Sequence, residues 1–216
     1  MKQIAIFGSG GFGREVAMLI EQINEKKTEW EFIGFYDDGI EKGKIINGFP
    51  VLGGINELNE WVEPLSLVFA IGNPITKKSI IEKVQNKDNV DYPTLVHPNV
   101  LIGDLKFNDI GEGCIITAGN ILTVNLAIGK HVILNLACTV GHDSIIGDYS
   151  SFMPSVNISG EVNIGQCVYV GTGAKIINQL EIGDNTVVGA GAVVAKSLPA
   201  NCTAVGIPAK PVKFHN

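Results

Sequence analysis

Charged side chains and paired cysteines are scarce in this sequence. Only 18% of the 216 residues are charged and 45% are hydrophobic, which excludes a disordered chain. The net charge of −6 lacks the basic excess of nucleic-acid binders, so no nucleic-acid partner is predicted. The four cysteines are separated by 24, 29 and 35 residues. Those spacings match no zinc or redox motif and indicate free thiols in a reducing, cytoplasmic setting.

A long hydrophobic run is also missing. The N-terminal sequence MKQIAIFGSGGFG has a short apolar run broken by glycines, which predicts neither a signal peptide nor a membrane span. Glycine is abundant, at 26 residues, and indicates many turns.

Residues 1–92 alternate strand-like and helix-like segments. Buried strands are expected at 4–7, 32–36 and 65–71, and helices at 14–26 and 74–85. This alternation predicts an α/β, Rossmann-like domain with a parallel sheet.

Beyond residue 92 the helical pattern gives way to a six-residue repeat. Fourteen positions spaced six apart, from Ile110 to Val188, are all apolar, and the dipeptide Ile-Gly recurs every 18 residues from Ile110. Three hexads therefore form one triangular coil, with the aliphatic residue inside and glycine in a tight corner. Stacked coils pair as parallel strands do. We expect an all-β column over residues 93–195, with Cys114 and Cys138 facing inward; a β-sandwich has no such period.

This repeat resembles the hexapeptide-repeat transferase family, whose fold is a left-handed parallel β-helix. Residues 192–213, AVVAKSLPANCTAVGIPAKPVK, look like the tail of its acetyl-coenzyme A-dependent members. The resemblance implies that residues 196–216 cap the column and that Lys210 meets a coenzyme phosphate. It also implies a homotrimer with active sites between adjacent columns. A tail that only caps the last coil is the alternative.

An acyltransferase needs a base, and histidine titrates near neutral pH. His215 lies in the tail, His97 begins the column and reads as structural, and His131 is predicted to face solvent. His142 stands out because it precedes Asp143, whose carboxylate is able to orient the ring. An ordinary exposed histidine is the alternative.

The whole chain resembles the bacterial sugar O-acyltransferase family, which includes sialic acid O-acetyltransferases and the N-acetyltransferase for UDP-linked bacillosamine precursors. That family has a histidine followed by an acidic residue in the matching coil, which implies His142 as the base and Asp143 as its helper. A backbone N–H near Gly160 is expected to stabilise the oxyanion. No metal is implied. The implied coenzyme contacts are Ser151, Gly160, Thr172, Ala190 and Lys210. At the position of Ser151 the bacillosamine enzyme has a histidine.

The turn GSGGFG at residues 8–13 fits G-x-G-x-x-G between a strand and a helix. Such a turn brings backbone donors to a phosphate. Alone it suggests NAD, but about 92 residues leave room for only one mononucleotide-binding half. By resemblance the domain grips the nucleotide of a nucleotide-sugar; a purely structural turn is the alternative. The implied substrate contacts are Gly10, Gly11, Phe12, Asp37, Asp38 and Gly72.

These observations predict an acetyl-coenzyme A-dependent N-acetyltransferase for a nucleotide-linked amino sugar, such as a 4-amino-4,6-dideoxyhexose, in surface polysaccharide or glycan synthesis. O-acetylation of a sugar hydroxyl, as in sialic acid, uses the same base and stays open. The intact His142–Asp143 pair counts against a non-catalytic solenoid. The identities of the sugar and the nucleotide stay open as well.

Overall fold

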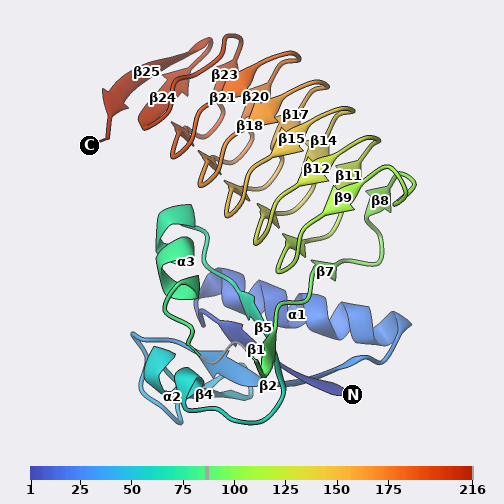
Figure 1. Ribbon diagram of the computed structural model, residues 1–216, viewed down its shortest axis with the longest axis vertical. Helices are drawn as coiled ribbons and strands as arrows, with labels where there is room; N and C mark the ends of the chain where they lie inside the picture. The colour runs from blue at the N-terminus through green and yellow to red at the C-terminus, as the bar shows by residue number, and fades with distance from the viewer. Residues whose placement is uncertain (86–87, 216) are drawn as a thin grey trace.

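The computed structural model describes residues 1–85 and 88–215. A small α/β domain forms the base of the molecule, and a column of stacked coils rises from it to the C-terminal end (Figure 1). Within the described residues, no helix has the length and apolar character needed to cross a membrane.

The α/β domain is built on a six-stranded sheet, which confirms the predicted Rossmann-like architecture. The strand order is β3-β4-β2-β1-β5-β6, and all neighbours are parallel except β3 and β4. Helix α1 covers one face of the sheet, and α2 lies against the other. The bounds are β1 (Lys2–Phe7), α1 (Gly11–Lys26), β2 (Trp30–Tyr36), β3 (Ile45–Ile46), β4 (Phe49–Gly53), α2 (Ile55–Asn59), β5 (Leu65–Phe69), α3 (Pro74–Ile81) and β6 (Val90–Asp91).

Several details of this domain differ from the sequence analysis, which predicted neither β3 nor β6. Helix α3 ends at Ile81, before the expected residue 85. Strand β4 and helix α2 were not predicted, because Pro50 and the neighbouring glycines interrupt the apolar pattern between residues 48 and 54.

The column consists of two-residue strands that stack into three parallel sheets, here called the first, second and third faces. The first face contains β7 (Leu95–Val96), β10 (Ile115–Ile116), β13 (Ile133–Leu134), β16 (Ser151–Phe152), β19 (Tyr169–Val170) and β22 (Val187–Val188). The second contains β8 (Leu101–Ile102), β11 (Ile121–Leu122), β14 (Thr139–Val140), β17 (Asn157–Ile158), β20 (Lys175–Ile176) and β23 (Val193–Val194). The third contains β9 (Asp109–Ile110), β12 (Ala127–Ile128), β15 (Ile145–Ile146), β18 (Asn163–Ile164) and β21 (Glu181–Ile182).

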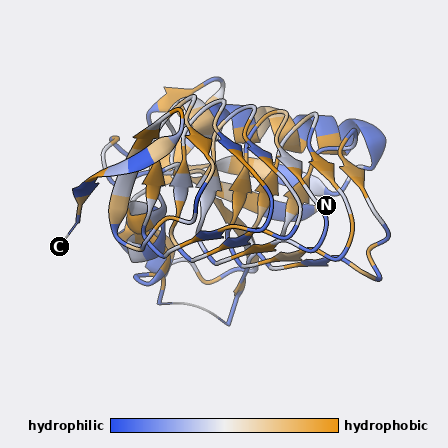
Figure 2. Ribbon diagram, turned by 90° about the horizontal axis from the view of Figure 1, so that it is seen from above, coloured by the Kyte–Doolittle hydropathy of each residue, from blue (hydrophilic) through white to orange (hydrophobic). Residues whose placement is uncertain are grey.

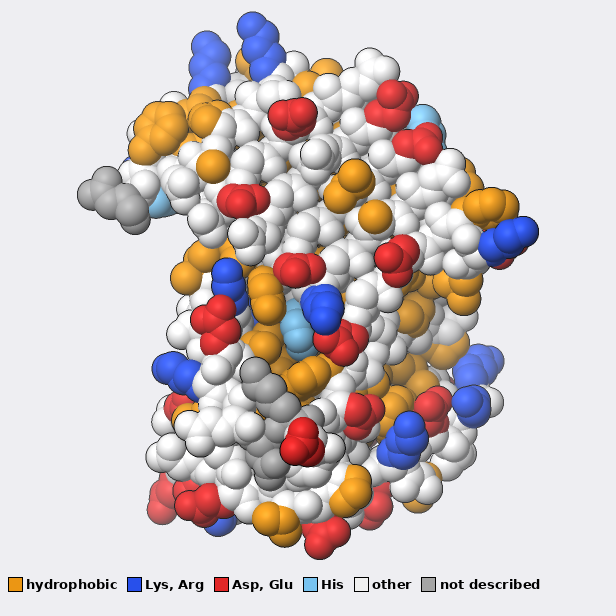
Figure 3. Space-filling model, in the orientation of Figure 1, with side chains coloured by type: hydrophobic (Ala, Val, Ile, Leu, Met, Phe, Trp, Pro, Cys, Tyr) orange, Lys and Arg blue, Asp and Glu red, His pale blue; other side chains and the backbone are white. Residues whose placement is uncertain are grey.

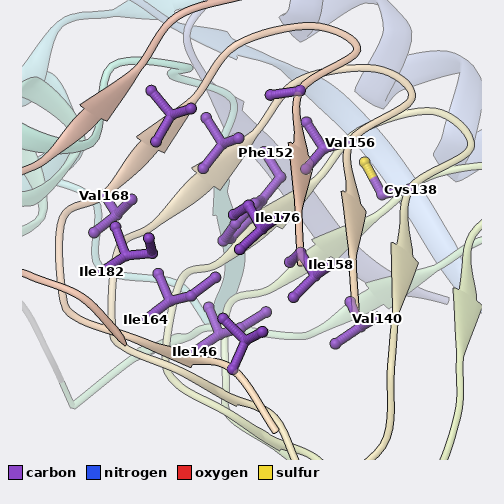
Figure 4. Packing of buried hydrophobic residues seen from close by; sticks show 14 of the residues in the cluster. Cys138, Val140, Ile146, Phe152, Val156, Ile158, Ile164, Val168, Ile176 and Ile182 are labelled. Carbon is purple, nitrogen blue, oxygen red and sulfur yellow. The ribbon is translucent and has the colours of Figure 1, made fainter. Parts of the chain in front are cut away.

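The interior of the column is filled as the repeat predicts. Ile128 is paired with Ile110 on one side and Ile146 on the other, so residues 18 apart stack along the column axis. Cys114 and Cys138 are fully buried within the same cluster. Figure 4 shows inward side chains of this cluster, among them Cys138, Ile146 and Ile164, stacked in rows. Figure 2 shows that the column strands are largely hydrophobic.

The glycines of the Ile-Gly dipeptides serve a different purpose from the expected one. None of the five has a positive φ; the left-handed positions of the corners are instead held mostly by other residues, such as Asn125 and Ala137. A Cβ on Gly129 would lie 2.3 Å from Asp148 Oδ1, and one on Gly147 would lie 2.5 Å from the backbone N of Gln166. Glycine is required there because successive coils approach too closely for any side chain.

The column has one further coil before Ile110, where the step of six begins. Strands β7 and β8 pair with β10 and β11 and so belong to it. Between β8 and β9 the strand spacing is eight residues instead of six, because the exposed Leu105 and Phe107 lie in an insertion. The insertion shifts the register and hides the first coil from a search at a constant period.

The α/β domain and the column share one hydrophobic core. On the outer side of the first face, Leu95, Ile115 and Ile133 are at most 1% exposed and cluster with Leu19 and Ile20 of α1. Figure 3 shows hydrophobic side chains gathered in the hollow where the two parts meet. This shared packing fixes the glycine turn in one orientation relative to the column.

The chain ends in a hairpin of β24 (Cys202–Gly206) and β25 (Ala209–Phe214). Strand β24 pairs in parallel with β22, so the hairpin extends the first face beyond the last coil. The bridge between Leu198 and Ile182 closes the third face.

Candidate active site

His142 and Asp143 occupy the corner between the second and third faces, after β14 and before β15. The His142 Nδ1 and the Asp143 Oδ2 are 2.8 Å apart. Their side chains are 56% and 49% exposed, so the ring lies on the outer wall of the column. With Nδ1 bound to the carboxylate, Nε2 is the nitrogen able to accept a proton from a ligand.

Asn125 completes this group and was missed by the sequence analysis. Its Nδ2 donates to Asp143 Oδ1 over 2.9 Å. This hydrogen bond, followed by the one from His142, lowers the pKa of the Asp143 carboxyl below its ordinary value. Asn125 precedes Asp143 by 18 residues, so the period of the column was the signal that points to it.

Gly160 lies directly against the imidazole from the next coil. A Cβ at this position would be 2.5 Å from His142 Nε2 and 2.6 Å from its Cε1, so any side chain here would displace the ring. The structure therefore brings together His142, Asp143 and Gly160 from the predicted set. The expected oxyanion contact at Gly160 stays a prediction.

Thr172 and Ala190 lie elsewhere, on the corner between the first and second faces. They are stacked neighbours, because the Gly191 N–H donates to the Thr172 carbonyl. The whole second face separates them from His142 within one chain. Lys210 is exposed on β25, beyond the last coil.

Ser151 is not placed to contact a coenzyme, so this prediction is corrected. The residue is fully buried, and its Oγ accepts a hydrogen bond of 3.0 Å from Lys77 Nζ of α3. The position faces the α/β domain because its strand β16 belongs to the first face.

His131 does not face solvent, contrary to the sequence analysis. It is only 4% exposed, stacks on Tyr149 with ring centroids 5.7 Å apart, and meets Tyr92 and Phe69 edge-on. Burial, followed by the charge of Lys77, lowers the pKa of the imidazole to about 4. The prediction was wrong because the hexad pattern describes the column and not the domain that covers it.

The glycine turn between β1 and α1 is open at its middle and closed at its ends. A Cβ on Gly10 would meet no atom within 4 Å, and one on Gly11 only the Arg14 side chain at 3.9 Å. A Cβ on Gly13, in contrast, would lie 2.0 Å from the Gly8 carbonyl oxygen. Gly10 and Gly11 are exposed at the start of α1, where backbone N–H groups favour an anion.

Asp37 and Asp38 both accept hydrogen bonds from other groups of the protein. Asp37 Oδ2 accepts from the N–H and the hydroxyl of Ser9 over 2.8 and 2.7 Å, and Oδ1 accepts from the Gly39 N–H. Burial raises the pKa of this carboxyl, but these hydrogen bonds outweigh it and the net pKa is lowered. Asp38 Oδ1 accepts from the Ile55 N–H at the start of α2. Asp37 therefore holds the glycine turn, and base recognition by the two carboxylates stays a prediction.

Gly72 marks where the edge of the sheet that bears the glycine turn faces the column. A Cβ on it would be 3.9 Å from Met153 Cε, which follows β16 at the corner between the first and second faces. Phe12 is half-buried and packs on the cluster beneath α1. Because β1 and β5 are neighbours in the sheet, the glycine turn lies at the same sheet edge as Gly72. Among the described residues, no group of three or more His, Cys, Asp or Glu is arranged to hold a metal ion.

Comparison with known proteins decides the family. The model described as the PglD N-terminal domain matches residues 3–84, and the bacterial transferase hexapeptide (six repeats) model matches residues 161–196. The GDP-perosamine N-acetyltransferase of Escherichia coli O157:H7 is 33% identical over 219 residues, covering 99% of this chain and 97% of that protein. The chain belongs to the sugar acyltransferase family. The predicted family and the prediction of an acetyltransferase are thereby confirmed.

Solved structures of sugar acyltransferases superpose on the whole chain. The acetyltransferase domain of PglB from Neisseria gonorrhoeae FA1090 has a TM-score of 0.89 at 30% identity, covering 98% of this chain and 100% of that one. PerB from Caulobacter crescentus, in complex with CoA and GDP-perosamine, has a TM-score of 0.84 at 27% identity, covering 99% and 98%.

Proposed function

We propose that this sugar acyltransferase transfers the acetyl group of acetyl-coenzyme A to the amine of a nucleotide-linked amino sugar, for glycan or surface polysaccharide synthesis. The observation that carries the proposal is the His142–Asp143 pair, with a 2.8 Å hydrogen bond at an exposed corner of the column. Support comes from the end-to-end match to a GDP-perosamine N-acetyltransferase and from the PerB complex with CoA and GDP-perosamine.

The chemistry needs one proton acceptor. The uncharged amine of the sugar attacks the thioester carbonyl, a C–N bond forms, and the carbonyl oxygen becomes an oxyanion. His142 Nε2 takes the proton that the nitrogen loses, while Asp143 favours the imidazolium that results. The C–S bond then breaks, and the coenzyme leaves as a thiolate that takes up a proton. Gly160 lies beside the ring, where a backbone N–H is suited to the oxyanion.

The same proposal includes a homotrimer with each active site between two columns. Within one chain Gly72, at the same sheet edge as the glycine turn, faces the corner of Met153, while His142 lies on the next corner, across the second face. A second chain packed on that face would bring its His142 to the first chain's nucleotide side. Closed cyclic symmetry then repeats the site without leaving an open face.

Exposed apolar side chains on the second face and its corners support this assembly. They protrude from several successive coils, and each is at least 38% exposed in the single chain: Leu101, Ile121, Val124, Leu136 and Ile177. Burial of such side chains between columns would stabilise the trimer. The four free cysteines are all buried, which fits a cytoplasmic protein.

The test is thiol release from acetyl-coenzyme A in the presence of nucleotide-linked amino sugars with different nucleotides. An aromatic disulfide reagent reports the product with little background, because the enzyme's own cysteines are buried. His142→Ala is expected to lower kcat by about 10²–10⁴-fold with little change in KM, the range of a lost general base. His215→Ala removes an imidazole from the terminal hairpin and serves as the control.

Near-normal turnover of His142→Ala at saturating substrates would refute the base assignment. Thiol release with sialic acids but with none of the amino sugars would replace N-acetylation by O-acetylation. Analytical ultracentrifugation tests the assembly, since a monomer at assay concentration would refute the shared site.

A further inference from the structure

We propose that Asn125 is a positioning residue that fixes the Asp143 carboxylate and, through it, the ring of His142. This inference rests on the proposed role of His142 as the base. Asn125 lies on the coil before the histidine, and its side chain contacts the Asp143 carboxylate and not the imidazole.

The backbone fixes the distance between the two coils at this corner. Asn125 and Asp143 both have φ of +58°, in the left-handed region that Asn and Asp tolerate better than most residues. The Asp143 N–H donates to the Val124 carbonyl over 3.0 Å, as the stacked coils require. The two side chains therefore leave equivalent positions in the same direction, and the amide reaches Oδ1 without strain.

The polarity of the contact also selects one arrangement of protons. The amide Nδ2 is only a donor, so it binds Oδ1 as an acceptor and favours the ionised carboxylate. The second oxygen, Oδ2, is left to accept the Nδ1 proton of His142. That tautomer leaves the lone pair on Nε2, the atom beside Gly160. Asn125 thus stabilises the form of the pair that is able to take a proton from substrate.

Exposure explains why a second contact is needed. Asp143 is 49% exposed, and a single hydrogen bond between exposed side chains is too weak to hold a carboxylate in one rotamer. With both oxygens bound, rotation of the carboxylate breaks two hydrogen bonds. Gly160 then limits the ring on its other side, so the imidazole is held from the coils on both sides.

A purely structural role for Asn125 as a corner residue is the competing explanation, and the same corner supplies its control. Glu161 and Gln179 occupy the two following coils with φ of +58° and +60°, and Gln179 Nε2 donates to Glu161 Oε2 over 3.2 Å. This second amide–carboxylate pair involves no histidine. Ala137 has a φ of +56°, so alanine is accommodated at a left-handed corner position.

The experiment is a double-mutant cycle on the full chain, with Asn125→Ala, Asp143→Ala and the double variant, and with Gln179→Ala as the matched control. Asn125→Ala is expected to lower kcat roughly tenfold with the KM of both substrates unchanged, as for coupled neighbours. In the Asp143→Ala background, removal of Asn125 is expected to have no further effect on kcat. Gln179→Ala is expected to stay within about twofold of the parent, since it lies outside the coupled group.

Three outcomes would overturn the inference: unchanged kcat in Asn125→Ala, additive losses in the double variant, or an equal loss in Gln179→Ala. The melting temperature of each variant separates unfolding from mispositioning. His142→Ala distinguishes the two proposals. If it loses activity while Asn125→Ala does not, only the positioning role is wrong; if it keeps activity, the base assignment is wrong.

Discussion

Lys77 gives the most direct physical test of how the α/β domain is joined to the column. The residue is fully buried on α3, and its Nζ donates to Ser151 Oγ. Burial lowers the pKa of the ammonium group from 10.5 to about 7, although Cys114 and Cys167 act in the opposite direction. The buried position therefore disfavours the charged form of this lysine.

Because the pKa of Lys77 is lowered in the folded protein, the free energy of unfolding depends on pH. Below pH 7 the ammonium is charged in both states, so the folded protein bears the full desolvation cost. Between pH 7 and 10.5 the unfolded chain binds more protons, and stability rises with pH. From pH 7 to 9 the pKa values of 10.5 and about 7 imply a gain of about 2 kcal/mol in the free energy of unfolding.

Replacing the lysine by methionine removes both the charge and its pH dependence. Ser151→Ala is combined with Lys77→Met so that no buried hydroxyl loses its partner. We expect the double variant to be more stable at pH 7 by about 1–4 kcal/mol, the range for buried ionic groups replaced by apolar ones. The difference in the free energy of unfolding between the double variant and the parent is expected to be smaller by about 2 kcal/mol at pH 9 than at pH 7.

Guanidinium unfolding at pH 7, 8 and 9 measures this difference at equal protein concentration, because subunit association also contributes to stability. The window lies above the titration of His131, whose pKa is lowered to about 4. Ionisation of the cysteines in the unfolded chain is common to both proteins and cancels. A stability difference between the two proteins that is the same at pH 7 and pH 9 would refute a buried, destabilised ammonium.

Three further predictions concern the turn, the site and the core. Gly160→Ala is expected to lower kcat at least tenfold, because its Cβ would displace His142 Nε2; unchanged thiol release would contradict this. Phe152→Ala removes a fully buried ring from the column interior and is expected to cost about 3–5 kcal/mol in chemical unfolding. Asp37 has a lowered pKa, so its contribution is present above its unfolded pKa and is lost as pH falls through the folded one. The stability difference between the parent and Asp37→Asn should therefore shrink in acid.

The interior of the column was predictable because its geometry repeats without variation. One aliphatic residue per strand points inward, and residues 18 apart stack, so Ile110, Ile128 and Ile146 could be aligned from their spacing alone. The step of six does not extend before Ile110, because the insertion near Phe107 changes the spacing between two strands. A constant period identifies a repeat only where the chain keeps it.

Contacts between the two parts of the chain were not predictable from the period. Ser151 and His131 occupy ordinary positions of the repeat, yet both are buried by the α/β domain. Sequence separation gave no sign that Lys77 would reach Ser151, 74 residues away. Asn125 was a different case, since stepping back 18 residues from Asp143 would have found it.

The common core under α1 has a consequence for which molecules the enzyme accepts. Because Ile115 and Ile133 are locked against that helix, the glycine turn cannot swing toward or away from the column as a hinged domain would. In the proposed trimer, the distance from the glycine turn of one chain to His142 of the next is therefore set by this packing together with the contact between columns. The proposed function then predicts selection by length: an amino sugar without its nucleotide would contact only one of the two sites, and a longer or shorter carrier would place its amine away from the thioester.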